Sequence, residues 1–243
     1  MKYLFGRAGR AELARFTHPR TLVAFDYDGT LAPIVKDPGA AWMRRRTVSL
    51  VRQVARRYRC AVITGRERAD VMRFLEHVPF ARVVGNHGGQ LDGRSASPFR
   101  ALVSRWALAL ESELSGVRGI FIERKTASVS VHWRGARDEP GARRSVARAV
   151  ARIEGARVTP GKKLVNLVPR GAPDKGWAVS RIRSALGCRQ VLFVGDDVTD
   201  EDVFALEARW LLSVRVGRRR RSLAGCYLHD QREVDRLLEA LLA

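Results

Sequence analysis

The sequence predicts a doubly wound, Rossmann-like α/β fold with a parallel sheet and one inserted α+β segment. Short apolar runs recur along the chain, and each is followed by a stretch with the apolar spacing of an amphipathic helix. The runs are apolar throughout, as in parallel strands that are buried on both faces. This alternation of apolar runs and helical stretches does not continue through residues 92–169. We therefore expect a core formed by 1–91 and 170–243, with 92–169 as an inserted cap domain.

The predicted core alternates strands with helices. We expect strands at 22–25, 61–63, 82–84, 191–194 and 211–216. We expect helices at 47–59, 67–77, 174–187, 200–208 and 231–242. Right-handed crossovers would place the carboxyl ends of all these strands on one edge of the sheet, which is the edge where ligands bind in open α/β sheets.

The inserted segment has a different pattern. Two stretches with helical spacing, at Pro98–Ser115 and Pro140–Glu154, are each followed by two short strand-like runs. The expected strands lie at 119–122, 126–132, 157–159 and 163–168. This arrangement predicts a small α+β domain that caps the sheet edge.

Composition limits the class of protein. The chain has 243 residues, 46% of them hydrophobic, and no apolar run long enough for a transmembrane helix. The N-terminus is a poor signal peptide. The three cysteines are scattered, which argues against a disulfide framework or a zinc site and favours the cytoplasm.

The net charge of +20 raises the alternative of nucleic-acid binding. The arginines, however, are spread along the whole chain, and no nucleic-acid motif accompanies them. The run Arg218–Arg221 is interpreted as a solvated loop. We expect neither a nucleic-acid partner nor a membrane partner.

Two carboxylates follow the first core strand, in the sequence Asp26-Tyr27-Asp28-Gly29-Thr30. Residues two apart in an extended chain point the same way, so Asp26 and Asp28 can face one site while Tyr27 faces away. Their mutual repulsion calls for a cation or a shared proton. The alternative is a capped turn after a buried strand.

A second acidic run follows the strand at 191–194 and places five acids between Asp196 and Asp202. Oxygen ligands at this density favour Mg²⁺. The alternative is a helix N-terminus, which attracts acidic side chains. We accept that alternative for Glu201 and Asp202, but Asp196 belongs to the strand end.

Two other turns offer groups that suit a phosphoryl oxygen. Thr64 ends a predicted strand and brings a hydroxyl next to Gly65 and Arg66. Lys175 opens a predicted helix and offers a compact cation. Each of these features alone is more often structural, but their order along the chain strengthens the set.

That order, DYDGT, TGR, DKG and GDDVTD, resembles the four motifs of the haloacid dehalogenase-like phosphatases. It is most similar to the trehalose-6-phosphate phosphatases, and the resemblance covers nearly the whole chain. Further similarity lies in GNHG at 85–88, ERK at 123–125, GKK at 161–163 and the extension to GDDVTDEDVF at 195–204.

The resemblance implies roles for the motif residues. Asp26 would be the nucleophile that forms an aspartyl-phosphate, and Asp28 the general acid and base. Thr64 and Lys175 would hold the phosphoryl oxygens. The resemblance also implies Mg²⁺ as cofactor, with Asp26, the Asp28 carbonyl and Asp196 as ligands. Asp197 is a further candidate for metal binding. Asp197 or Asp200 could also support the ion indirectly, by holding its ligands.

The sugar would be recognised in the cap. Glu123 and Lys125 match the pattern of the family and flank one position, so they can point together. The alternative is an exposed charge pair. Arg66, Asn86 and His87 are further candidates for substrate binding.

The chain departs from the family pattern at two positions. Asn166 stands where a glutamate is expected, and Val168 stands where a basic residue is expected. Asn166 remains a candidate for sugar binding, because its amide can still accept from a hydroxyl. These two departures weaken the expectation that the substrate is trehalose 6-phosphate. The catalytic motifs are unchanged.

Three hypotheses follow. The first is hydrolysis of trehalose 6-phosphate to trehalose and phosphate. The second is the same chemistry on another phosphosugar, such as glucosyl- or mannosylglycerate phosphate or sucrose 6-phosphate. The third is a non-catalytic protein that senses sugar phosphates or binds nucleic acid. In the first two, the partner is a small phosphosugar.

Overall fold

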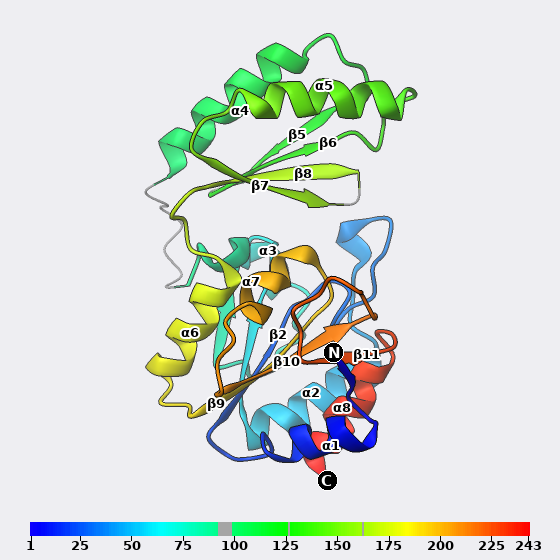
Figure 1. Ribbon diagram of the computed structural model, residues 1–243, viewed down its shortest axis with the longest axis vertical. Helices are drawn as coiled ribbons and strands as arrows, with labels where there is room; N and C mark the ends of the chain where they lie inside the picture. The colour runs from blue at the N-terminus through cyan, green and yellow to red at the C-terminus, as the bar shows by residue number, and fades with distance from the viewer. Residues whose placement is uncertain (92–98, 126, 162) are drawn as a thin grey trace. The chain divides into compact units, whose positions relative to one another are not determined.

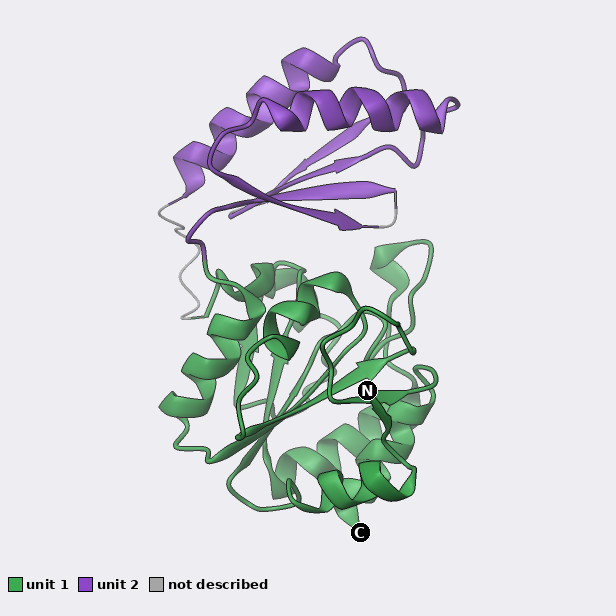
Figure 2. Cartoon of the chain, in the orientation of Figure 1, with its two compact units in different colours: residues 1–93, 173–243 green, residues 94–172 purple. Residues whose placement is uncertain are grey.

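In the computed structural model the chain folds as two units, which are coloured separately in Figure 2. Residues 1–93 and 173–243 form the first unit, and residues 94–172 form the second. The sequence analysis divides the chain after residues 91 and 169. The structure describes residues 1–91, 99–125, 127–161 and 163–243. Four predicted features lie outside the described residues: Pro98, Thr126, Lys162 and the boundary at residue 92.

The first unit contains a seven-stranded sheet in the order β1-β11-β10-β9-β2-β3-β4 (Figure 1). Every pairing in it is parallel, and helices cover both faces, which confirms the predicted fold class. Its strands are β1 (Lys2–Tyr3), β2 (Thr21–Phe25), β3 (Arg59–Ile63), β4 (Arg82–Val84), β9 (Gln190–Gly195), β10 (Leu211–Val216) and β11 (Cys226–Leu228). The pair β1 and β11 was not predicted, because strands of two and three residues carry too short an apolar pattern.

The helices of this unit are α1 (Arg7–Ala14), α2 (Arg45–Arg57), α3 (Arg68–Met72), α6 (Lys175–Ala185), α7 (Glu201–Phe204) and α8 (Glu233–Leu242). Two of them, α3 and α7, are much shorter than predicted. Glu76 and His77 lie within the predicted helix 67–77 but have φ values of 46° and 57°. Glu207 interrupts the predicted helix 200–208 in the same way, with φ 41°. A residue with positive φ cannot continue a right-handed helix.

Alternate residues of the core strands point into two separate apolar clusters. Val23 and Phe25 of β2 join the cluster that includes buried residues of α2 and α8. Leu22 and Ala24 join the cluster that includes buried residues of α6 and α7. Burial on both faces explains the continuous apolar runs in the sequence, since both sides of each strand need apolar side chains.

The second unit has one four-stranded antiparallel sheet in the order β5-β6-β8-β7. Its elements are α4 (Arg100–Leu114), β5 (Phe121–Arg124), β6 (Val129–His132), α5 (Glu139–Ala151), β7 (Ala156–Gly161) and β8 (Leu164–Pro169). Both helices cover the same face of the sheet (Figure 1). Val129 and Val131 of β6 point toward the helices, whereas Ser130 belongs to the opposite face.

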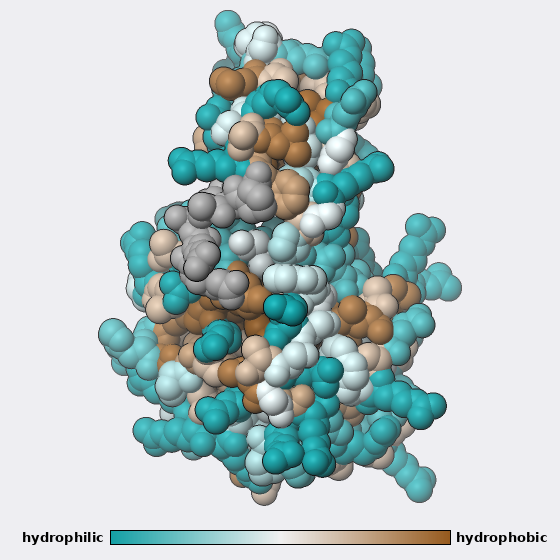
Figure 3. Space-filling view, turned by 90° about the vertical axis from the view of Figure 1, so that its left-hand side faces the viewer, coloured by the Kyte–Doolittle hydropathy of each residue, from teal (hydrophilic) through white to brown (hydrophobic). Residues whose placement is uncertain are grey.

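The surface is strongly polar. Figure 3 shows hydrophilic side chains standing out around smaller apolar patches on one face of the molecule. Residues 218–221 form an exposed loop, as predicted. Within the described part of the chain, no helix combines the length and apolar character needed to span a membrane.

Candidate active site

The carboxyl end of β2 places Asp26 at the edge of the central sheet. The main-chain N–H of Asp26 donates to the carbonyl of Val194 at 2.8 Å, so the β2–β9 ladder continues one residue past β2. Tyr27 points the other way, as predicted, and its hydroxyl donates to the carbonyl of Ala41 at 2.8 Å. Asp26 is buried, and its carboxylate position is therefore fixed by the sheet.

Gly29 brings the turn after β2 against Asp196. Its φ is +81°, and a Cβ added to it would lie 2.2 Å from Oδ2 of Asp196. Gly195 has the same function on the other side, because a Cβ there would lie 2.3 Å from the carboxyl carbon of Asp200. The two glycines allow acidic side chains to approach the backbone of neighbouring strands closely.

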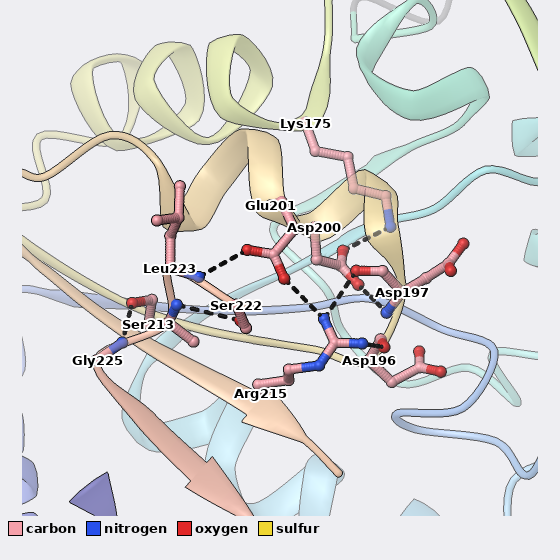
Figure 4. A network of polar contacts seen from close by, with 11 residues as sticks. Lys175, Asp196, Asp197, Asp200, Glu201, Ser213, Arg215, Ser222, Leu223 and Gly225 are labelled. Carbon is pink, nitrogen blue, oxygen red and sulfur yellow. Dashed lines mark hydrogen bonds and ion pairs between the residues drawn. The ribbon is translucent and has the colours of Figure 1, made fainter. Parts of the chain in front are cut away.

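Three carboxylates meet at this edge. Asp26, Asp196 and Asp200 each offer an oxygen within 4.8 Å of the others, and among the described residues this is the group that could hold a metal ion. Lys175, the first residue of α6, lies between Asp26 and Asp200, and Figure 4 shows its contact with Asp200. Its Nζ is 3.0 Å from Oδ1 of Asp26 and 2.7 Å from Oδ1 of Asp200.

One lysine does not balance this charge. Burial, with the neighbouring Asp200 and Asp196, raises the pKa of Asp26 well above its usual value despite Lys175. Burial, with Asp200 and Asp197, raises the pKa of Asp196 to about 7. Burial alone would lower the pKa of Lys175, but the two carboxylates raise it overall, so the lysine stays charged.

The donor set fits a hard divalent cation. Oδ1 of Asp196 is buried and has no hydrogen-bond partner. A carboxylate oxygen in that situation is costly unless a cation or proton joins it. Carboxylates and main-chain carbonyls are the ligands that Mg²⁺ prefers. Asp26 and Asp196 therefore suit such an ion.

Asp197, the further candidate for metal binding, is not a member of this group of three carboxylates. It is exposed, and its carboxylate accepts from the backbone of Asp200 in a capping box over the turn Val198–Asp200. The side chain of Asp200 in turn accepts from the N–H of Asp197 at 2.8 Å. Because this reciprocal cap uses the Asp197 carboxylate, the structure groups Asp200 rather than Asp197 with the other acids.

The turn after β3 carries Thr64, which is buried. Its Oγ1 accepts from the N–H of Arg66 at 3.1 Å, so the hydroxyl hydrogen remains available for a phosphoryl oxygen. Arg66 itself pairs with Asp28, the predicted general acid and base. The sequence analysis assigned Arg66 to substrate binding and did not predict this pair.

The turn Asn86–Gly88 is hydrogen-bonded to the turn that carries Thr64. The N–H of His87 donates to the carbonyl of Thr64 at 2.9 Å, and the N–H of Asn86 donates to the carbonyl of Arg66 at 2.8 Å. A Cβ on Gly65 would lie 2.4 Å from the His87 ring. Asn86 and His87 thus contact the Thr64 turn through their backbone and, for His87, through the ring.

Three of the candidate substrate-binding residues, Glu123, Lys125 and Asn166, lie in the second unit, and the structure brings them together there. Glu123, Ser130 and Asn166 stand opposite one another on β5, β6 and β8. Nζ of Lys125 is 3.5 Å from Oε2 of Glu123. Oγ of Ser130 donates to Oδ1 of Asn166 at 2.6 Å.

His132 was not predicted as part of this set. Its Nε2 lies 3.1 Å from Oε2 of Glu123. The signal was present in the sequence, because Ser128, Ser130 and His132 alternate with valines and therefore share one face of the strand. Hydrogen bonding to His132 and the charge of Lys125 hold the pKa of Glu123 below its usual value, against the effect of burial.

A family model described as trehalose-phosphatase matches residues 24–209. The chain is 35% identical over 216 residues to a trehalose-phosphate phosphatase of Mycobacterium avium and 34% identical over 202 residues to that of Mycobacterium marinum. These alignments cover 82% and 77% of this chain and 52% of each relative. The chain therefore spans about half the length of the curated relatives it matches.

Solved structures show the same architecture over nearly the whole chain. A trehalose-6-phosphate phosphatase related protein superposes with a TM-score of 0.71 at 27% identity, over 91% of this chain and 96% of its own. The C-terminal domain of the Candida albicans trehalose-6-phosphate phosphatase gives a TM-score of 0.79 at 22% identity, over 96% of each chain, which bears on the fold alone.

Proposed function

This chain belongs to the trehalose-phosphatase family, and from that premise we propose that it is a magnesium-dependent phosphatase that hydrolyses trehalose 6-phosphate to trehalose and phosphate. One observation carries the proposal. Asp26, Asp196 and Asp200 converge with Lys175 at the carboxyl ends of β2 and β9. A buried nucleophile, a cation-binding pair and a phosphate-binding lysine are then within reach of one phosphoryl group.

In the first step a carboxylate oxygen of Asp26 attacks phosphorus. The bond between phosphorus and the sugar oxygen breaks, and Asp28 gives its proton to the leaving alkoxide. The product is an aspartyl-phosphate on Asp26. Lys175 already holds Oδ1 of Asp26, which orients the carboxylate and leaves Oδ2 for the attack.

In the second step Asp28 takes a proton from a water molecule, and the water oxygen attacks phosphorus. The acyl-phosphate bond breaks, phosphate leaves, and Asp26 and Asp28 return to their starting states. Lys175 and the Thr64 hydroxyl hold the phosphoryl oxygens. Asp26, Asp196 and the Asp28 carbonyl would hold Mg²⁺, which when bound would neutralise negative charge on the phosphoryl group.

The second unit is proposed as the cap domain that selects the sugar. Glu123, Lys125 and Asn166 offer a carboxylate, an ammonium group and an amide on one face of its sheet. Such groups suit sugar hydroxyls. Asn166 favours a second candidate, another phosphosugar, because its carbonyl oxygen is already used by Ser130.

The three cysteines are free and buried, which supports a reducing compartment such as the cytoplasm.

The test is release of inorganic phosphate from a panel of phosphosugars with Mg²⁺ present. We expect the largest kcat/KM for trehalose 6-phosphate. A larger kcat/KM for sucrose 6-phosphate or glucosylglycerate phosphate would move the assignment to that sugar and keep the chemistry. Absence of phosphate release from every member of the panel, with folded protein and Mg²⁺, would exclude the proposed activity.

A further inference from the structure

Arg215 is a buried arginine near the carboxyl end of the otherwise mostly apolar strand β10. It is 4% exposed and stands opposite Gly195 of β9, directly before the acidic loop. A buried charge is costly unless it is paired and hydrogen-bonded. The partners of this guanidinium therefore show what the position needs.

The guanidinium reaches under the acidic loop and holds its backbone (Figure 4). Nη2 donates to the main-chain carbonyl of Asp196. Nη1 donates to the main-chain carbonyl of Asp197 at 3.1 Å. Two consecutive carbonyls are thus fixed by one rigid planar group, and these two peptide groups flank the Cα atom of Asp197 and follow that of Asp196.

Glu201 completes the arrangement. Its Oε1 accepts from Nη1 of Arg215 at 3.0 Å, and its Oε2 accepts from the N–H of Leu223 at 2.9 Å. The carboxylate is therefore held from both sides, by β10 and by the loop that precedes β11. The sequence analysis attributed Glu201 to the helix N-terminus alone, because its partners lie far along the chain.

We propose that Arg215 is a positioning residue for magnesium binding, which acts through the carbonyls of Asp196 and Asp197 and is itself oriented by Glu201. The inference rests on the proposed function, since it assumes that Asp196 is a metal ligand. Arg215 touches neither the metal-ligating oxygens nor Lys175 through any contact described above. It acts by fixing the position of the Asp196 backbone, from which the side chain extends toward the proposed ion.

The direction in which the affinity for Mg²⁺ changes distinguishes a positioning role of Arg215 from a purely electrostatic one. Removing a cation near the site would by itself tighten the binding of Mg²⁺, because the remaining charge becomes more negative. Loss of the two carbonyl contacts would weaken binding, because the loop would no longer be held for Asp196 to meet the ion. We expect the second effect to be larger.

The test is the dissociation constant of Mg²⁺ for the substrate-free full chain, measured by titration calorimetry. Arg215→Met should weaken binding by about tenfold to a hundredfold, the usual range for groups that orient metal ligands. Arg215→Lys keeps the positive charge but lacks the planar guanidinium that donates to two carbonyls. It should therefore bind Mg²⁺ with an intermediate dissociation constant. Glu201→Gln removes one of two acceptors and should weaken binding to a smaller extent.

Arg10→Met is the matched control. The Nε of Arg10 donates to the carbonyl of Phe5 at 2.9 Å, which is a comparable contact far along the chain from the acidic loop. This variant should lower the melting temperature without changing the dissociation constant of Mg²⁺. A second readout is steady-state kinetics. At saturating Mg²⁺, Arg215→Met should recover most of kcat and keep the wild-type KM for the phosphosugar.

Mg²⁺ binding by Arg215→Met that equals or exceeds that of the wild type would overturn the inference. If Arg215→Met does not fold, then Arg215→Lys and Glu201→Gln decide the question by the same measurement. Failure of the wild type itself to bind Mg²⁺ would instead contradict the proposed function, so the two failures are distinguishable.

Discussion

Arg66 holds the carboxylate of Asp28 with two hydrogen bonds, from Nε to Oδ2 and from Nη2 to Oδ1, each 2.6 Å long. The guanidinium also packs on two aromatic rings. Its Cζ lies 4.9 Å from the ring centre of Phe74 and 5.6 Å from that of Tyr27. The paired geometry fixes the plane of the carboxylate. Arg66 thus orients the group that the proposed mechanism uses to move the proton.

Arg66→Lys should lower kcat for a phosphosugar by about tenfold. The loss should be smaller than the roughly 10²–10⁴-fold loss on removal of a general acid, since Asp28 remains present. A phosphate ester with a good leaving group should be affected less, because its leaving oxygen needs no proton. Arg68→Lys is the control, since Nε of Arg68 donates to the carbonyl of Val83. Equal losses on both substrates would separate Arg66 from proton transfer.

Asp26→Asn should abolish phosphate release, by at least about 10⁴-fold, because an amide cannot form the acyl phosphate. The variant should remain folded, since Lys175 keeps its contact with Asp200. Phosphate release and the melting temperature are measured on the same preparation. Near-normal turnover by this variant would rule out the covalent mechanism.

Added Mg²⁺ should raise the melting temperature of the wild type by roughly 5–10 °C at about one hundred times its dissociation constant. The proposed ion would bind the folded acidic group and give the buried Oδ1 of Asp196, which has no hydrogen-bond partner, a cation to contact. A chelator should reverse the shift, and Asp196→Asn should lack it. Equal melting temperatures with Mg²⁺ and with chelator would contradict a metal site here.

Glu123 should remain ionised at a pH where an ordinary glutamate is half protonated. Its folded pKa is lowered by the hydrogen bond to His132 and by Lys125. The stabilisation from a lowered carboxyl pKa is present above the unfolded pKa near 4.5 and is lost as the pH falls through the folded pKa. His132→Ala should move the pKa of Glu123 upward, which a carboxyl-carbon NMR titration measures.

The control for that titration is His18→Ala, which removes an exposed histidine of the first unit. It should leave the Glu123 curve unchanged. An unaltered curve in His132→Ala would show that the hydrogen bond at 3.1 Å does not hold the carboxylate in its ionised form.

Asn166→Glu should lower KM for trehalose 6-phosphate about fivefold without changing kcat. A charged hydrogen bond contributes roughly 1 kcal/mol more than a neutral one, which corresponds to that factor. Asn166→Gln has the same length without the charge and serves as the matched control. A higher KM in Asn166→Glu would indicate that the natural substrate differs at the group this residue meets.

The convergence of Asp26, Lys175 and Asp196 could be predicted from the sequence because they follow strands or open a helix, and topology alone brings such positions together. The sequence did not distinguish Asp197 from Asp200, since only the turn between them decides which carboxylate caps the backbone. Arg215 was missed because two of its partners are main-chain carbonyls, which leave no mark in a sequence, and the third, Glu201, is distant along the chain. The short strands β1 and β11 were missed because pairing, rather than composition, defines them.

The two units carry different sets of the proposed site residues. Asp26, Thr64, Lys175 and Asp196 all belong to the first unit, and Glu123, Lys125 and Asn166 all belong to one uninterrupted stretch, residues 94–172. A single recombination event could exchange that stretch and leave the reacting groups as they are. New substrates can then be acquired without rebuilding the catalyst, and a library of exchanged inserts is the corresponding laboratory route.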